Sequence, residues 1–176
     1  MVVTIFLKEK NTLDVYSSCK IYGSEFEQKT GPDFKELYEQ ASSLPNVNYI
    51  GYKPHEYILE HITDYDLFVY PSIFEETFCA SALEALSAGL HVITSNFGAL
   101  PETCSEWPIY VNYTKDLNML ASATAQAIDV ASGYLHTKVI QDHLDEQQKF
   151  YKRFYSWEKK GVEWTNFLKG ALSVKR

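Results

Sequence analysis

Glutamates in one segment have the spacing to bind a sugar. The segment begins at Pro71 and reads PSIFEETFCASALEALSAG, with Glu75 and Glu76 just before a predicted helix and Glu84 two turns into it. Eight steps along a helix of ~3.6 residues per turn bring Glu84 to within roughly 80° of Glu76, so both can face one cleft. Carboxylate oxygens accept hydrogen bonds from hydroxyls, and the pair therefore suits the vicinal diols of a ribose or a hexose.

The backbone around these glutamates also suits a phosphate. The predicted helix runs from about Phe78 to Ala88, and its N-terminus near Thr77 and Phe78 presents amide N–H groups that can bind phosphate oxygens. The next loop, SNFGALPET, contains Gly98, which permits a close approach of the backbone. Acidic residues before a helix also stabilise the helix dipole, so the spacing alone leaves a purely structural interpretation open.

The elements that position these loops alternate between strands and helices. Short β-branched and aromatic runs cover residues 13–17, 47–50, 67–70, 91–94 and 109–111, which is typical of βα units and a mainly parallel sheet. Residues 2–7 fit either a sixth strand or a helix. Ligands of an open parallel sheet bind at the carboxyl ends of its strands, so we expect both loops at one edge of the sheet.

Helical patterns separate the strands and close the chain. They cover residues 34–44, a stretch from Pro54 to before Asp64, residues 78–88 ending at Gly89, and a helix from Leu117 that ends at Gly133 with Leu117, Leu120, Ala121, Thr124 and Ile128 on one face. Two helices follow from about Leu135, the second capped near Ser156. We predict an α/β fold: a Rossmann-like parallel sheet with helices on both faces, closed by C-terminal helices, in a single domain over residues 1–176.

Composition excludes several classes of protein. With 16 Lys and Arg against 23 Asp and Glu, the net charge of −7 argues against a nucleic-acid partner. Three cysteines without CxxC spacing, Cys19, Cys79 and Cys104, argue against a disulfide framework or a four-cysteine zinc site. A reducing compartment, the cytoplasm, fits best. The longest uncharged stretch, residues 85–101, is interrupted by Gly and Pro, so we expect no integral membrane segment. The histidines lack ligand spacing, and we expect no metal.

The segment from Asp66 to Glu102 resembles the donor-binding signature of retaining glycosyltransferases with the GT-B architecture, family four in particular. The motifs DLFVYPS (66–72), ETFC (76–79), EAL (84–86), AG (88–89), VIT (92–94) and GALPE (98–102) match that signature in order and spacing. Residues 48–52 resemble the strand and turn beside the nucleotide base in that family, and residues 155–157 the start of its terminal helix. The resemblance covers the chain from roughly residue 13 to residue 172.

This resemblance implies roles for individual residues. Glu84 would accept hydrogen bonds from the ribose hydroxyls of a nucleoside-diphosphate sugar. Glu76 would hold hydroxyls of the transferred sugar at the catalytic centre, with the amides of Phe78 and Cys79 nearby. Cys79 stands where the family often has Gly, and we expect it to be a small buried residue without thiol chemistry.

The loops around these residues complete the implied site. Gly98 and Ala99 would border the phosphate and sugar of the donor, and Tyr52 and Lys53 would lie near the base. His91, which stands where the family often has Pro, is expected to be structural. The implied reaction needs no metal and no cofactor besides the donor: the sugar moves to an acceptor hydroxyl, and the leaving phosphate deprotonates that hydroxyl.

The sequence departs from the family in two ways. The strand, Gly-Arg and Lys that bind the donor diphosphate in the family have no counterpart here, and neither Lys8 nor Lys10 stands in that context. The acceptor-binding domain that precedes this half in the family is also missing from the sequence. The chain therefore resembles half of an enzyme, and we expect either a glycosyltransferase donor-binding domain or a catalytically incomplete module for nucleotide-sugar binding or interaction.

The missing half predicts a partner. A separate acceptor-binding chain or a second copy of this chain would supply the other face of the cleft. The last predicted helix carries Trp157, Trp164, Leu168 and Leu172 on its apolar face, and its aromatic residues are more typical of a core than of cofactor contacts. Without a partner, Trp157, Trp164 and Phe167 would form an exposed apolar patch.

Overall fold

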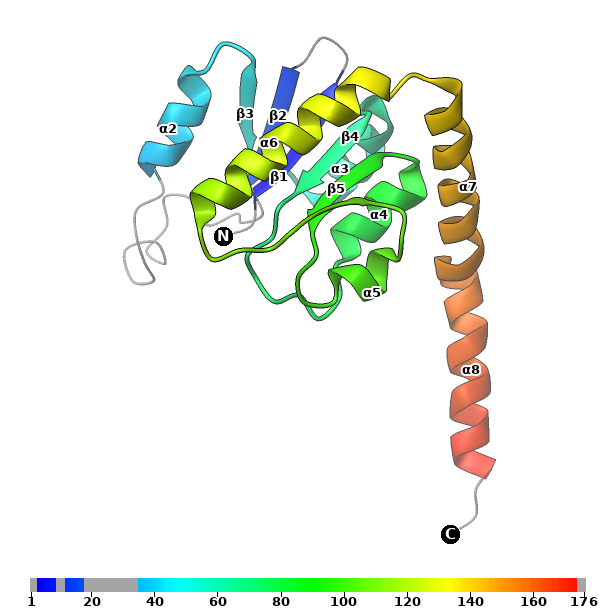
Figure 1. Cartoon of the computed structure of the whole chain (residues 1–176). Coiled ribbons are helices and arrows are strands. Elements are labelled where there is room, and N and C mark those ends of the chain that lie inside the picture. The colour runs from blue at the N-terminus through cyan, green and yellow to red at the C-terminus, as the bar shows by residue number, and fades with distance from the viewer. Residues whose placement is uncertain (1–2, 9–11, 18–34, 174–176) are drawn as a thin grey trace.

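The computed structural model describes residues 3–8, 12–17 and 35–173, and a mixed sheet lies at its centre (Figure 1). The described strands are β1 (Val3–Lys8), β2 (Thr12–Ser17), β3 (Val47–Gly51), β4 (Leu67–Tyr70), β5 (His91–Ser95) and β6 (Ile109–Val111). They are ordered β3-β2-β1-β4-β5-β6. The β2–β3, β4–β5 and β5–β6 pairs are parallel, whereas β1 runs antiparallel to both β2 and β4. The predicted, mainly parallel sheet is confirmed, and the ambiguous N-terminal segment is a strand.

The two faces of the sheet bury two separate apolar clusters. Successive residues of a strand point to opposite faces. In β4, Leu67 and Val69 accordingly join one cluster, and Phe68 and Tyr70 join the other. The first cluster is covered by helix α6 (Leu117–Tyr134), and the second by α4 (Ala80–Ala88) and α5 (Leu100–Cys104). A strand buried on both faces reads as a continuous apolar run, which is why the sequence identified β4.

Within the described residues, helices α2 (Lys35–Ser43) and α3 (His55–His61) precede β4. Helix α2 follows the segment 18–34, which lies outside the described residues, and α3 continues into a 3-10 turn at Ile62–Asp64. The start of the predicted 34–44 helix, at Phe34, also lies outside the described residues. The predicted helix after Pro54 is confirmed as α3 with its 3-10 extension.

Helix α4 ends as predicted but begins later. The φ of Gly89 is +88°, and its amide and that of Leu90 donate to carbonyls of the last turn, as in a left-handed cap. The helix begins at Ala80 rather than at Phe78, because Cys79 has an extended backbone with φ −108° and ψ 94°. Glu76 therefore lies in the loop before α4, and Glu84 lies in the second turn of the helix.

Helix α6 differs from the prediction in which residues it buries and in where it ends. Asp116 caps its N-terminus by accepting from the amides of Asn118 and Met119. The buried side chains include Leu120 and Thr124 as predicted, but Leu117 and Ala121 are exposed. The helix continues through Gly133 to Tyr134 instead of ending at the glycine.

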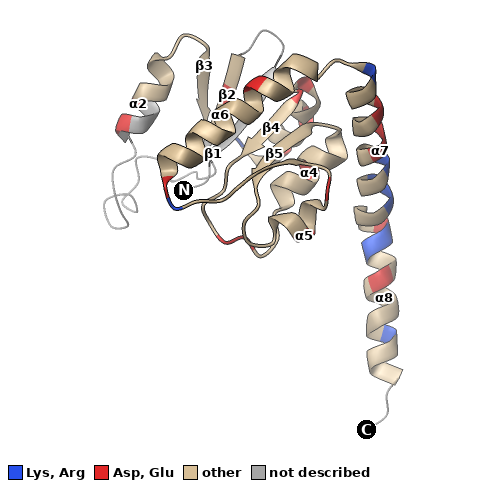
Figure 2. Cartoon of the chain, in the orientation of Figure 1, with Lys and Arg blue, Asp and Glu red and all other residues tan. Residues whose placement is uncertain are grey.

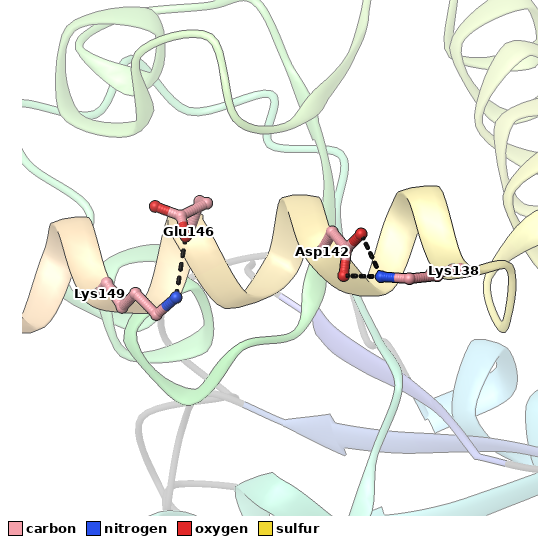
Figure 3. Close-up of polar contacts among 4 residues, drawn as sticks. All are labelled: Lys138, Asp142, Glu146 and Lys149. Carbon is pink, nitrogen blue, oxygen red and sulfur yellow. Dashed lines mark hydrogen bonds and ion pairs between the residues drawn. The ribbon is translucent and has the colours of Figure 1, made fainter.

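Helix α7 (Lys138–Tyr155) packs one face on α4 and exposes the other. Gln147 is fully buried, and its side-chain amide donates to the carbonyls of Leu86 and Leu90 at the end of α4. On the exposed face, Lys138 pairs with Asp142 at 2.7 Å and Lys149 with Glu146 at 2.8 Å (Figure 3). Such surface pairs contribute little stability, so the buried face of α7 holds the helix in place.

Helix α8 (Trp157–Ser173) extends beyond the body of the protein (Figure 1). The Ser156 hydroxyl accepts from the amide of Lys159, which confirms the predicted cap. None of the residues of α8 is buried, and the exposed fractions are 90% for Trp157, 62% for Trp164 and 65% for Phe167. Figure 2 shows charged residues along α7, whereas the C-terminal part of α8 carries few. The aromatic residues of α8 therefore form the exposed patch and not a core.

None of the described helices is both long enough and apolar enough to cross a membrane.

Candidate functional site

Glu76 lies in the loop after β4, and a buried tyrosine at the end of that strand holds it by a hydrogen bond. Tyr70 is 5% exposed, and its hydroxyl donates to Oε1 of Glu76 at 2.7 Å. Burial, together with the bond to Glu76, raises the pKa of Tyr70, so the hydroxyl keeps its proton and remains a donor. The carboxylate of Glu76 is therefore oriented by the core before any ligand binds.

The loop after β5 packs directly on the Glu76 backbone. Gly98 has φ +58°, and a Cβ placed on it would lie 2.6 Å from the Glu76 amide nitrogen. The amide of Ala99 donates to the Glu76 carbonyl at 2.7 Å. Closer to the ends of β4 and β5, the Ser95 hydroxyl donates to the Ser72 carbonyl at 2.6 Å. The structure thus brings predicted residues Glu76, Gly98 and Ala99 together at the carboxyl ends of β4 and β5.

The loop after β6 joins the same edge through Asn96, which sequence reasoning missed. The Asn96 side chain accepts from the Tyr113 amide at 2.7 Å and donates to Oδ1 of Asn112 at 2.9 Å. The rings of Phe97 and Tyr113 stack with centroids 3.9 Å apart. An asparagine directly after a buried strand was the available signal, because its side chain can satisfy backbone groups of a neighbouring loop.

Cys79 and Phe78 lie between Glu76 and α4 but differ in exposure. Cys79 is 5% exposed, which confirms the predicted burial, and that burial raises the pKa of its thiol. Phe78 is 55% exposed. Since α4 begins at Ala80, the amides of its first turn belong to residues 80–82, and the prediction of a helix N-terminus at Thr77 and Phe78 is wrong by two to three residues.

Glu84 contacts His55, a residue for which the sequence indicated no role. Nε2 of His55, the first residue of α3, lies 2.8 Å from Oε1 of Glu84. The side chain of Glu84 is 30% exposed, so it remains accessible. This contact ties the loop after β3, which carries Tyr52 and Lys53, to helix α4. Tyr52 is 41% exposed, and the Lys53 ammonium lies 5.1 Å from the centre of the Tyr57 ring.

Cations are scarce in the loops around the two glutamates. Residues 52–54, 71–79 and 96–99 contain one lysine, Lys53, and no arginine. Lys8 is described only as part of the β1 backbone, and Lys10 lies outside the described residues. Within the described part of the chain, His, Cys, Asp and Glu side chains form no cluster that could hold a metal ion. These described loops can accept hydroxyls at two carboxylates and offer only Lys53 as a cation for a diphosphate.

His91 lies inside the sheet and away from these loops. It is 4% exposed at the start of β5, and burial, assisted by His143, lowers its pKa to about 4. Its ring is tilted against that of Tyr134, with centroids 6.1 Å apart. The expectation that His91 is structural agrees with this position.

The sequence profile of the family described as glycosyl transferases group 1 matches residues 7–129. Among curated proteins, the GPI3 subunit of phosphatidylinositol N-acetylglucosaminyltransferase from Saccharomyces cerevisiae is 27% identical over 127 residues. The matched part is 71% of this chain and 26% of the yeast protein. This chain therefore spans about a quarter of the length of the curated relatives it matches.

Several solved structures share the fold of this chain, and one of them is named as a glycosyltransferase. A glycosyltransferase from Rickettsia africae ESF-5 superposes with a TM-score of 0.68 at 20% identity, over 80% of this chain and 36% of that one. Sucrose-phosphate synthase from Thermosynechococcus elongatus gives a TM-score of 0.61 at 24% identity, over 81% and 34%. The GtfA/B complex gives 0.57 at 19% identity, over 90% and 29%. At these identities the likeness is one of fold.

Proposed function

Because the chain belongs to the group 1 glycosyl transferases, we propose that it is the donor-binding half of a retaining enzyme that transfers a sugar from a nucleoside diphosphate to an acceptor hydroxyl. The observation that carries the proposal is the fixed direction of two carboxylates near one edge of the sheet. Tyr70 orients Glu76, and His55 orients Glu84, each through a bond to one carboxylate oxygen.

Each carboxylate has its own part in the proposed complex. Glu84 accepts from the ribose hydroxyls of the donor, and Glu76 accepts from hydroxyls of the transferred sugar. The Gly98 and Ala99 backbone borders the donor phosphate and sugar, close to Glu76. Tyr52 and Lys53 lie near the base, on the loop that His55 links to Glu84.

The proposed reaction requires no nucleophile from the protein and no metal. The leaving phosphate deprotonates the acceptor hydroxyl on the face of the sugar from which it departs, so the anomeric configuration is retained. Glu76 acts at the catalytic centre by orienting the sugar. Holding a reactant in one geometry removes entropy that an unbound reaction would have to lose in its transition state.

A partner surface is part of the proposal. Charge on a leaving diphosphate is stabilised by fixed cations, and residues 52–54, 71–79 and 96–99 carry only Lys53. We propose that an acceptor-binding chain, or a second copy of this one, contributes the remaining cations and contacts the apolar side of α8. The reduced thiols expected of the cytoplasm fit Cys79 and Cys104, which are both buried and unpaired.

The scarcity of cations also favours a second candidate, a module that binds nucleotide sugars without turning them over. One series of measurements separates the two. Thermal shifts should be recorded with uridine, guanosine and adenosine diphosphates and with their glucose, mannose and N-acetylglucosamine derivatives. N-acetylglucosamine is included because the yeast relative is named as a transferase of that sugar. A ligand of the native state raises the melting temperature with concentration.

Donors that bind are then tested for hydrolysis or transfer. Turnover would support the enzyme, and saturable binding without turnover would support the module. A chain that binds none of the nucleotides or nucleotide sugars at millimolar concentration would contradict both.

A further inference from the structure

We infer that His55 is a positioning residue that sets the carboxylate of Glu84 for the ribose of the donor. This inference rests on the proposed function and adds to it a residue of α3, outside the segment that carries the glutamates. In it, His55 occupies Oε1 of Glu84 and leaves Oε2 to accept from a ribose hydroxyl.

The bond itself has the geometry of a strong contact. Nε2 of His55 and Oε1 of Glu84 are 2.8 Å apart, a normal distance for a nitrogen donor and a carboxylate. The ring must donate from Nε2, and it can do so in the neutral Nε2–H tautomer or when protonated. Glu84 thus keeps its full acceptor character in the direction that the ring does not occupy.

His55 and Glu84 both belong to helices that pack against the core. Glu84 lies between buried Leu83 and Ala85 on α4, so its backbone has little freedom. Pro54 precedes His55 with φ −58°, and its carbonyl accepts from the Ile58 amide in the first turn of α3. Because the side chains that anchor α3 join the same core cluster as α4, the two helices hold His55 and Glu84 at a fixed separation.

The exposure of the pair indicates function more than stability. The side chains are 61% exposed for His55 and 30% exposed for Glu84. Exposed pairs of this kind contribute little to folding, because water competes for both partners. The same exposure leaves Glu84 open to a ligand, and a carboxylate already held in one rotamer loses less side-chain entropy on binding.

The test compares His55→Ala, His55→Gln and a control, His136→Ala, in the full chain. His136 is an exposed histidine between α6 and α7, remote in sequence from the glutamate loops. The first ligand is whichever of uridine, guanosine and adenosine diphosphate binds the unsubstituted chain most tightly. The second is the 2′,3′-dideoxy analogue of that nucleotide, which lacks both ribose hydroxyls. Calorimetry measures the Kd of each ligand for each variant. Thermal melting is measured for every variant.

We expect His55→Ala to weaken binding of the ribonucleotide by about threefold to fivefold and of the dideoxy analogue by less than twofold. His55→Gln, which keeps an N–H donor near the position of Nε2, should recover most of the affinity. His136→Ala should change neither Kd, and melting temperatures should stay close to that of the unsubstituted chain.

Three results would overturn the inference and are distinct from a failure of the proposed function. Equal losses for the two nucleotides in His55→Ala would show an effect unrelated to the ribose hydroxyls. A tighter Kd in His55→Ala would show that the ring blocks the site. If the unsubstituted chain binds no nucleoside diphosphate, the proposed function fails and this inference fails with it. If the chain binds and Glu84→Ala weakens binding while His55→Ala does not, only the inference fails.

Discussion

Gly98 and Glu76 touch through their backbones. A Cβ on Gly98 would lie 2.6 Å from the amide nitrogen and 2.8 Å from the carbonyl oxygen of Glu76, and that carbonyl accepts from the Ala99 amide at 2.7 Å. The loops after β4 and β5 are therefore one unit. The position of the Glu76 carboxylate therefore depends on Tyr70 and also on the absence of a side chain at Gly98 in the neighbouring loop.

Gly98→Ala should displace the Glu76 loop. The new Cβ meets backbone atoms that cannot rotate away, and a φ of +58° is strained for alanine. We expect the free energy of unfolding, measured in urea, to fall by about 1–3 kcal/mol, and donor binding to be lost. The control is Gly133→Ala in α6, where no atom beyond the adjoining residues and backbone of its own helix lies within 4 Å of the added Cβ. That variant should be neutral or more stable by up to ~1 kcal/mol. Equal stabilities for the two variants would contradict the tight contact.

Tyr70→Phe should separate binding of the sugar from binding of the nucleotide. Removing the hydroxyl deletes its 2.7 Å bond to Glu76, and a hydrogen bond to a charged group contributes about 1.5–3 kcal/mol. We expect the affinity for the nucleoside-diphosphate sugar to fall about tenfold, with the affinity for the nucleoside diphosphate nearly unchanged in calorimetry. Tyr151→Phe is the control: Tyr151 is buried and donates to the Cys104 carbonyl, so this variant should lose stability without a change in either affinity. Equal losses for both ligands in Tyr70→Phe would argue against a contact of Glu76 with the sugar.

Glu84→Ala should weaken binding of the nucleoside diphosphate itself. The ribose hydroxyls lose a charged acceptor, which corresponds to ~1–3 kcal/mol in calorimetry. Glu146→Ala serves as the control, because Glu146 is an exposed carboxylate on α7 whose partner is Lys149 (Figure 3). An unchanged Kd in Glu84→Ala would remove this residue from the proposed site.

The sheet was predictable because its strands carry local signals. The run at β5 is buried throughout, and the predicted 91–94 differs from His91–Ser95 by one residue. For residues 2–7, most of which form β1, the sequence left strand and helix open. The pairing of β1 with β2 and β4 settles the conformation, and such pairing is a tertiary property that a six-residue window does not contain.

For the candidate site, the sequence indicated residue types but not their geometry. Helical spacing from Glu76 to Glu84 predicted that both carboxylates can face one cleft, whereas the backbone at Cys79 is extended and the loop before it docks on Gly98. His55 and Glu84 are 29 residues apart in sequence. Only the packing of α3 and α4 on one core brings them together, so spacing along the chain gave His55 no role.

Acid should destabilise the protein through His91. Burial, assisted by His143, lowers its pKa to about 4 from 6.5, so the native state holds His91 neutral where the unfolded chain binds a proton. The contribution is complete above the unfolded pKa, declines as the pH falls below 6.5, and is lost by about pH 4. Between about pH 7 and about pH 4.5, the free energy of unfolding should fall by about 2 kcal/mol more than in His91→Leu, as measured in urea. Parallel pH profiles for the two proteins would contradict a buried neutral ring.

The apolar side of α8 should drive association of the isolated chain. Trp157, Trp164 and Phe167 are exposed on a helix that extends beyond the body (Figure 1), and contiguous apolar patches mark contact surfaces. We expect concentration-dependent association in sedimentation velocity, which a variant with glutamine at all three positions should lose while keeping its thermal melting and nucleotide affinity. Val139→Gln is the control, because it removes an exposed apolar side chain from α7 and should leave association unchanged. A chain that stays monomeric at every concentration would indicate that this patch binds only a different protein. In that case we expect an acceptor-binding partner to capture the unsubstituted chain but not the glutamine variant.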